Sequence, residues 1–220
     1  MGSRARAGVL GVAVGLLGFG LLAALARRAG VATVELPRVA GAEPWSTARA
    51  LGVVAYLALT LDVLVGLGLT TRAGDRWPGR AAGVDLHAWL SPLALGLTAA
   101  HAVALLADAY IGFDLVDLVV PFASSYRPVA VGVGVLAAYA ALVVHGSFAL
   151  RGRLGTAWWR RLHALSFVAY VLATAHGLAA GTDARAPWAR ALYLVATTAV
   201  AVLVVRRVVR ALAARRAAAP

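Results

Sequence analysis

The amino-acid sequence predicts an all-α fold: a polytopic membrane helix bundle of six transmembrane helices whose N- and C-termini are cytoplasmic. Composition is the first observation, because 62 % of the 220 residues are hydrophobic and only 14 % are charged. A soluble domain carries about 45–50 % apolar and roughly 25 % charged residues, so these apolar residues are too many for one soluble core. The second observation is their grouping into six long runs, and the third is an uneven distribution of arginine between the loops.

Six apolar runs, separated by short segments that hold arginine, proline and acids, predict the six spans. A helix needs about 20 mostly apolar residues to cross a bilayer, and each run is long enough. The runs are 8–26, 49–70, 85–107, 128–150, 162–180 and 188–208. The first run begins like a secretory signal, but the apolar stretch of a signal has about 7–15 residues. Because Arg27 and Arg28 directly follow this longer run, we expect a retained helix.

The arginine distribution predicts the orientation. The N-terminus, the second and fourth gaps and the C-terminal tail hold fourteen arginines, whereas the other three gaps hold seven. Arginine-rich short loops stay on the cytoplasmic side. We therefore expect a multi-pass protein of the cell (cytoplasmic) membrane, in contact with membrane lipid, with residues 211–220 as a basic cytoplasmic tail. The long outer gap, 108–127, mixes acids with apolar residues, which favours a short amphipathic segment on the membrane surface.

Composition also excludes several kinds of site. The chain has no cysteine, which removes disulfides, iron–sulfur clusters, thiolate metal sites and the covalent attachment of c-type haem. Met1 is the one methionine, so a haem iron in this chain would depend mainly on histidine ligands. The formal net charge is +12. Since the arginines lie in short loops between apolar runs, we interpret them as topology signals and expect no nucleic-acid binding.

Five histidines lie inside or at the edges of the predicted spans, where ionisable residues are costly and usually functional. They are His87, His101, His145, His163 and His176. The third and fifth spans carry two each, and both spans run from inside to outside. His87 should therefore lie level with His163 near the inner face, and His101 level with His176 near the outer face. The two levels are about 20 Å apart along either helix.

Two histidine pairs at two depths favour haem over zinc. Zinc takes about four ligands that converge on one point, whereas each pair suits the two axial positions of a six-coordinate haem. An iron that is ligated on both sides has no open position, which favours electron transfer over oxygen binding. We therefore expect two b-type haems, with His87, His163, His101 and His176 as the metal ligands.

The histidine spacing differs between the two helices. Fourteen residues separate His87 from His101 and leave them about 40° apart, on one face of an ideal helix. Thirteen residues separate His163 from His176 and leave them about 140° apart. Local distortion of the fifth span, helix tilt or offset haems would each reconcile the two spacings. Pro92 should kink the third span.

Other polar residues are further candidates. His145 is an alternative ligand, a contributor to a flavin or quinone site, or a packing residue. Arg160 and Arg161 stand beside the expected inner haem and are candidates to pair with its propionates, although topology explains them as well. Asp62 lies inside the second span, where a buried carboxylate is a functional candidate or the partner of an arginine near the inner end.

The histidine pattern resembles that of the ferric reductase-like transmembrane domain family, a six-helix haem module. Ferric reductases, NADPH oxidases and the haem-binding subunit of the methionine sulfoxide reductase system share this module. The likeness rests on His87 with His101 and on His163 with His176. The stretch 158–163, Trp-Trp-Arg-Arg-Leu-His, is similar to the start of the fifth helix in the sulfoxide reductase subunit. The resemblance covers about residues 48–210, which leaves 1–47 as the first transmembrane helix and an outer loop.

The resemblance implies a direction. A cytoplasmic reductant would feed an inner haem held by His87 and His163, and electrons would pass to an outer haem held by His101 and His176, then to an acceptor outside. We find no nicotinamide or flavin domain, so we expect an electron-transfer subunit of an oxidoreductase. It would use a separate electron donor, or a loosely bound FMN or quinol. The acceptor would be an extracytoplasmic partner reductase or a ferric chelate.

Three questions stay open at this point. The first is whether the chain is an enzyme in its own right. The second is an alternative function as a quinol-oxidising cytochrome b subunit, with Asp62 or His145 near the quinone. The third is a function outside redox chemistry, as a small transporter or metal-handling membrane protein whose histidines relay protons or bind metal.

Overall fold

The structure of the chain, a computed structural model, describes residues 43–71 and 79–217. Every regular element within these ranges is a helix. The helices are α2 (Glu43–Thr71), α3 (Arg80–Ala107), α4 (Leu115–Val119), α5 (Pro128–Ala149), α6 (Arg151–Leu154), α7 (Thr156–His163), α8 (Leu165–Ala180) and α9 (Pro187–Ala217). Since α8 follows α7 after a single residue, the two helices together form one candidate span, Thr156–Ala180.

Five of these segments are long and apolar enough to cross a membrane: α2, α3, α5, α7 with α8, and α9. They confirm the all-α membrane bundle and five of the six predicted spans. The sixth predicted span, 8–26, and most of the region 1–47 lie outside the described residues. The cytoplasmic placement of both termini stays a prediction.

Several helices extend past the apolar runs. α2 begins at Glu43, before the run at 49–70, and α9 continues to Ala217, past the run at 188–208. A chain that leaves the apolar layer keeps its backbone hydrogen bonds by continuing the helix. The predicted basic tail is therefore, as far as Ala217, the last part of α9. α3 stays helical through Pro92.

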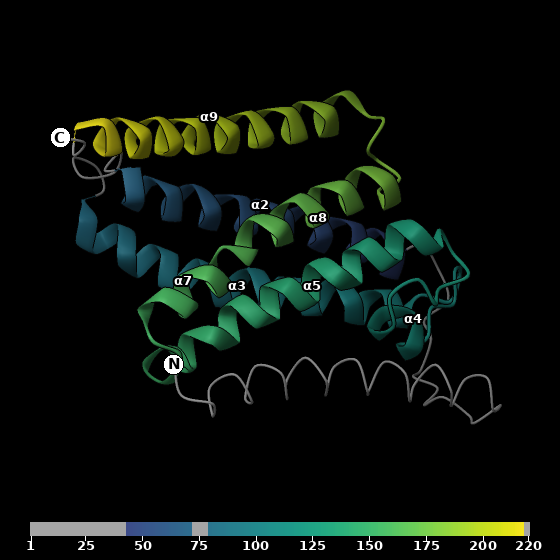
Figure 1. Cartoon of the computed structure of the whole chain (residues 1–220). Coiled ribbons are helices and arrows are strands. Elements are labelled where there is room, and N and C mark those ends of the chain that lie inside the picture. The colour runs from purple at the N-terminus through teal and green to yellow at the C-terminus, as the bar shows by residue number, and fades with distance from the viewer. Residues whose placement is uncertain (1–42, 72–78, 218–220) are drawn as a thin grey trace.

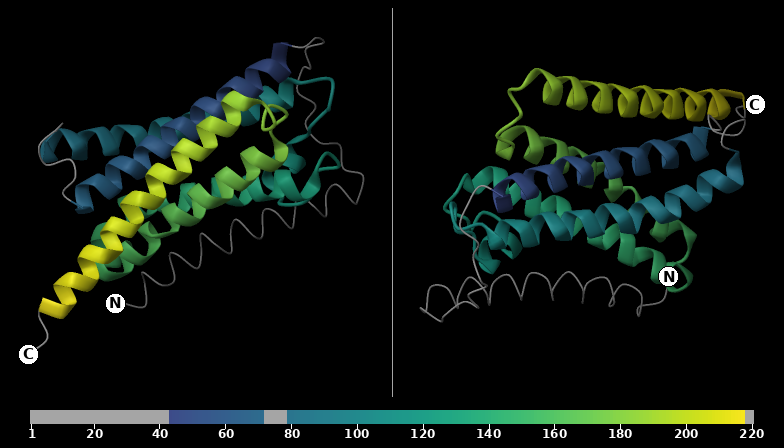
Figure 2. Two further views of the ribbon diagram at one scale, coloured as in Figure 1. Left: turned by 90° about the horizontal axis from the view of Figure 1, so that it is seen from above. Right: turned by 180° about the vertical axis from the view of Figure 1, so that it is seen from behind.

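The long helices lie side by side along one direction (Figure 1). α2 packs against α3, α8 and α9, and α5 packs against α8. One end of the bundle carries α6, α7 and the C-terminal end of α9, whereas the other end carries α4 and the loop between α8 and α9 (Figure 2). This arrangement follows from spans that reverse direction at each turn.

The core forms where α2 meets α8 and α9. Its buried residues are Tyr56, Val63, Leu67, Tyr170, Ala196 and Val200. The rings of Tyr56 and Tyr170 stack with their centres 5.8 Å apart, and their hydroxyl oxygens are 3.1 Å apart. A buried hydroxyl needs a hydrogen-bond partner, so this pair fixes α8 against α2 within the apolar layer.

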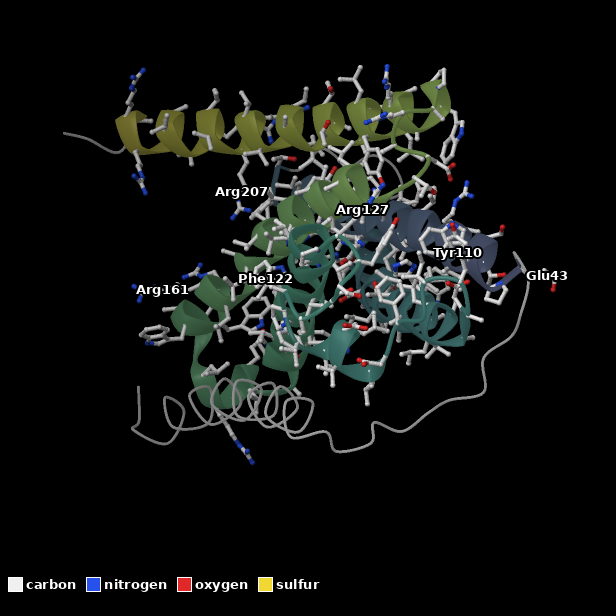
Figure 3. The ribbon with its side chains drawn as sticks, turned by 90° about the vertical axis from the view of Figure 1, so that its right-hand side faces the viewer. Glu43, Tyr110, Phe122, Arg127, Arg161 and Arg207 are labelled. Atoms are coloured by element: carbon white, nitrogen blue, oxygen red, sulfur yellow. The ribbon has the colours of Figure 1, made fainter. Side chains whose placement is uncertain are left out.

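Short polar contacts hold the loops at the end of the bundle that faces the viewer in Figure 3. Arg127 donates to the carbonyl oxygens of Ala179 and Ala180 at 3.0 and 3.2 Å. These carbonyls lie in the last turn of α8, where a helix leaves its own acceptors without partners. The contact therefore caps α8 and joins it to the start of α5.

The helix α4 lies where the sequence predicts an amphipathic segment. It opens with a capping box in which Asp114 and Asp117 each accept a hydrogen bond from the backbone N–H of the other, both at 3.0 Å. Phe113 and Val116 are buried. The apolar side of this segment thus covers the end of the bundle.

Arg49 of α2 and Asp183 of the α8–α9 loop form an ion pair, in which Nε donates to Oδ2 at 2.9 Å. Their side chains are 38 % and 30 % exposed, so we expect the pair to contribute about 0.5–1 kcal/mol. Arg49→Asp should lower the free energy of unfolding, measured in detergent micelles, because two carboxylates then face each other. Adding Asp183→Arg should restore much of the loss. Additive losses without recovery in the double variant would show that the pair does not join these elements.

Candidate functional site

Two pairs of histidine rings face each other across the space between α3 and the α7–α8 span. The ring centres of His101 and His176 are 6.3 Å apart and their planes are inclined at 74°. The ring centres of His87 and His163 are 6.0 Å apart, with planes at 87°. The structure thus brings together the same two pairs that the sequence places at equal depth.

These separations match two imidazoles that share one metal ion. A metal–nitrogen bond of about 2.0 Å on each side, and about 1.1 Å from each nitrogen to its ring centre, place two ring centres roughly 6.2 Å apart. Within residues 43–71 and 79–217, no group of three or more histidine or acidic side chains converges to hold a metal. A centre with one imidazole on each side therefore fits these residues better than a four-ligand zinc centre.

Three of the four rings are anchored through Nδ1 to a backbone carbonyl of a neighbouring helix. The anchors are His101 to Ala48 at 2.7 Å, His176 to Ala130 at 2.8 Å and His87 to Asp62 at 3.2 Å. A carbonyl oxygen only accepts hydrogen bonds, so Nδ1 carries the proton in each of these rings. Nε2 is then the nitrogen that remains for a metal.

A glycine stands four residues after each of these carbonyls and makes room for the ring. The three glycines are Gly52, Gly66 and Gly134. A Cβ added to Gly52 or Gly66 would meet the facing ring at 3.2 or 3.1 Å, and one added to Gly134 would lie 2.5 Å from Nδ1 of His176. Small residues let helices approach closely within a membrane. Each ring reaches the backbone because the residue one turn further along carries no side chain.

Sequence reasoning on the histidines alone misses these glycines, although a signal for them exists. Gly52 and Gly66 are 14 residues apart, and so are His87 and His101. α2 and α3 run antiparallel, so a single register places both rings of α3 against matching positions of α2. These glycines can therefore be identified by a pattern: two glycines on the span before the histidine-bearing span, separated by the same number of residues as the two histidines.

His163 is held differently, at a break in the fifth span. α7 ends at His163 and α8 begins at Leu165, with Ala164 between them. The indole of Trp159 stacks on the His163 ring, with centres 5.2 Å apart and planes at 23°. A straight helix would leave His163 and His176 about 140° apart. The break at Ala164 is a local distortion of the fifth span, which is one of the three ways to reconcile the two histidine spacings. With this break, His163 and His176 both lie next to histidine rings of α3.

A cavity of about 270 Å³ occupies the interior between the same helices. His101 and His176 line it, and it extends along the bundle to Asp62. Much of its wall consists of small residues, among them Ala94, Ala138, Ala141, Ala169, Ala173 and Gly177. Among the described helices, α3 packs closely on α2 and α8 on α5, without comparable packing of α3 against α8. The paired rings and the small side chains around them fit a flat macrocycle with an axial ligand on each side.

The other candidate residues lie outside the two ring pairs. Nδ1 of His145 is 3.3 Å from Oγ of Ser91. Arg160 and Arg161 are exposed on α7, and the Arg161 guanidinium lies over the ring of Trp158, 4.9 Å from its centre. None of these three candidates therefore takes part in either ring pair.

Asp62 contacts a histidine instead of an arginine. Its carboxylate oxygen Oδ1 lies 2.7 Å from Nδ1 of His87. The same nitrogen is 3.2 Å from the Asp62 carbonyl oxygen. The pair of His87 and His163 thus has a carboxylate next to it.

Five described helices that are long and apolar enough to span a membrane, two of them carrying facing pairs of histidine rings, define a multi-pass membrane protein. Residues 51–174 match the family described as ferric reductase like transmembrane component, and the chain belongs to this family. The match includes His87, His101 and His163 and ends two residues before His176. None of the curated proteins and none of the solved structures matches the chain. Domains of this family in general bind haem, and membership makes the chain a membrane electron-transfer module.

Gly134→Ala should displace the His176 ring and destabilise the protein, because the new Cβ would lie 2.5 Å from Nδ1. Overpacking of this kind costs about 1–3 kcal/mol. Gly146→Ala on the same helix meets nothing within 4 Å, and should be neutral or stabilising because a helical glycine costs about 0.5–1 kcal/mol relative to alanine. The free energy of unfolding in detergent micelles measures both effects. Equal stability of the two variants would show that Gly134 does not make room for the ring.

Proposed function

We propose that the chain is a membrane b-type cytochrome that carries electrons across the cytoplasmic membrane, through two bis-histidine haems, to an extracytoplasmic acceptor. His87 and His163 would hold the inner haem, and His101 and His176 the outer haem. The observation that carries the proposal is the pair of ring-centre separations, 6.0 and 6.3 Å, which suit one axially ligated iron in each pair. Haem of the b type needs no cysteine, and the chain has none.

The chain's own residues would position the cofactor and tune it. When bound, haem supplies an iron that takes up and releases single electrons. Contacts from Nδ1 to backbone carbonyls hold the imidazoles of His87, His101 and His176 in one orientation and would raise their basicity as ligands. Each pair of histidines would ligate the iron from both sides and would leave it no open position. This arrangement supports electron transfer over the binding of oxygen.

Two stacked sites suit transfer across the apolar layer. The 14-residue step from His87 to His101 is about 21 Å along α3, within a hydrocarbon layer of about 30 Å. Two macrocycles at these levels would span much of the layer. The two histidine pairs would thus hold a redox cofactor at each level, which would let electrons cross the layer.

The electron balance requires partners on both sides. One electron would enter from a separate cytoplasmic or membrane donor, for example a reduced flavin such as FMN or a quinol. One electron would leave to an oxidised partner reductase outside, or to a ferric chelate whose iron becomes ferrous. Arg160 and Arg161 lie exposed on α7 at the inner end, where they would attract an anionic donor or pair with haem propionates.

The alternatives draw less support from the residues. A quinol-oxidising subunit would use Asp62 or His145 at the quinone, but Asp62 lies against His87 and His145 lies next to Ser91. A bare metal ion in a transporter or metal-handling protein would take more than two protein ligands, and no group of three or more histidine or acidic side chains converges within residues 43–71 and 79–217. Family membership also favours redox chemistry.

Electron transfer into sealed vesicles tests the proposal. Liposomes that contain the purified protein and trapped ferricyanide should let external dithionite reduce the ferricyanide, with one electron for each ferricyanide. His101→Ala and His176→Ala should each remove the outer haem, halve the haem content and abolish this transfer. His145→Ala is the matched control, because this histidine lies outside both ring pairs, and should retain two haems and full transfer.

Two results would count against the proposal. Full haem content in both the His101→Ala and His176→Ala proteins would contradict the ligand assignment. Undiminished transfer in a protein that has lost the outer haem would contradict the route.

A further inference from the structure

On the side formed by α2 and α3, the two candidate metal levels are built alike but differ in one charge. At the outer level, His101 contacts the backbone carbonyl of Ala48. At the inner level, His87 contacts the carbonyl of Asp62, 14 residues further along α2 and in the same antiparallel register. The Asp62 side chain then adds a second contact, since Oδ1 lies 2.7 Å from Nδ1 of His87. At the outer level the corresponding side chain is the methyl group of Ala48.

The carboxylate of Asp62 is held away from water. Its side chain is 13 % exposed and that of His87 is 27 % exposed. Within the described residues, Oδ1 of Asp62 has no hydrogen-bond partner, so its 2.7 Å approach to Nδ1 of His87 acts through the charge of the carboxylate. The charge of Arg207 on α9 also acts on His163, and this side chain points from α9 toward the bundle (Figure 3). Because electrostatic energy falls with distance, the carboxylate in contact with the ring should outweigh this cation.

A carboxylate and a carbonyl differ in their effect on a metal-bound imidazole. Nδ1–H of His87 donates to the Asp62 carbonyl, as that of His101 does to the Ala48 carbonyl, and the Asp62 carboxylate adds a negative charge 2.7 Å from the same nitrogen. A nearby negative charge favours ferric over ferrous iron, because the ferric ion carries the higher charge. In apolar surroundings such interactions are weakly screened.

We propose that Asp62 is a positioning residue that acts through His87 and lowers the reduction potential of the inner haem below that of the outer haem. This inference rests on the proposed function, since it takes both haems as bound. It gives the transfer a direction: an electron moves downhill from the inner level to the outer level, and its return is uphill. A single acidic side chain supplies this asymmetry between two sites with identical iron ligands.

Potentiometric titration of the full-length protein in lipid nanodiscs, followed by haem absorbance, tests the inference. The wild type should show two separate midpoints. Asp62→Asn keeps the size of the side chain and removes its charge, so the lower midpoint should rise while the upper one stays. We expect a change of about tenfold in the electron equilibrium between the haems, which is about 59 mV for one electron.

Asp85→Asn is the matched control. Asp85 is exposed on α3, two residues before His87, and its replacement removes the same formal charge at a similar depth. Both midpoints should stay at their wild-type values in this variant. An equal rise of the lower midpoint in the Asp62→Asn and Asp85→Asn proteins would overturn the inference, because the contact with His87 would then not matter.

The remaining outcomes separate this inference from the proposed function. Two haems with unchanged midpoints in Asp62→Asn, or a single shared midpoint in the wild type, would overturn the inference and leave the proposed function intact. A folded wild type without haem would overturn the proposed function itself.

Asp62→Asn could fail to bind the inner haem, and the Asp62→Glu variant then tests the inference. Asp62→Glu retains the charge, so this protein should retain the inner haem at a low midpoint. Loss of the inner haem there too would overturn the inference, since Asp62 would then build the site without tuning it.

Discussion

The contact between an imidazole Nδ1 and a backbone carbonyl of the neighbouring helix is the interaction on which the rest of the bundle depends. A histidine is costly in an apolar layer unless its N–H has an acceptor. In a helix, each carbonyl already accepts from the N–H four residues further along. A ring reaches that oxygen only where the residue at that position leaves space, as Gly52, Gly66 and Gly134 do. Each contact therefore orients a ring and fixes the register of two helices together.

This constraint explains the order of packing in the bundle. α3 is joined to α2 and α8 to α5, so the helices that carry the histidines meet through their rings instead of through close backbone packing. The break at Ala164 turns His163 toward α3, and Trp159 holds its ring from the other side. α9 then covers α2, where the stacked pair of Tyr56 and Tyr170 closes the core. The site thus stands on membrane helices, which hold ligands more firmly than loops do.

Much of the fold is readable from the sequence, and the exceptions have physical causes. Hydropathy predicts the five described spans because the bilayer imposes a similar length on every helix. Depth predicts which histidines meet, since the third and fifth spans run in the same direction. The break at Ala164 is not readable, because the residues around it, 162–166, include neither proline nor glycine. The contact of Asp62 with His87 is not readable either, since hydropathy reveals a buried charge without its neighbour.

The central claim is that each ring pair holds one haem iron between two imidazoles. The most direct test combines a pyridine haemochrome assay with electron paramagnetic resonance of the purified wild-type protein, expressed with ample haem. We predict two b haems per chain, both low-spin, because an iron with an imidazole on each face is six-coordinate. A folded protein that holds no haem, or haem with high-spin iron at both sites, would contradict the claim.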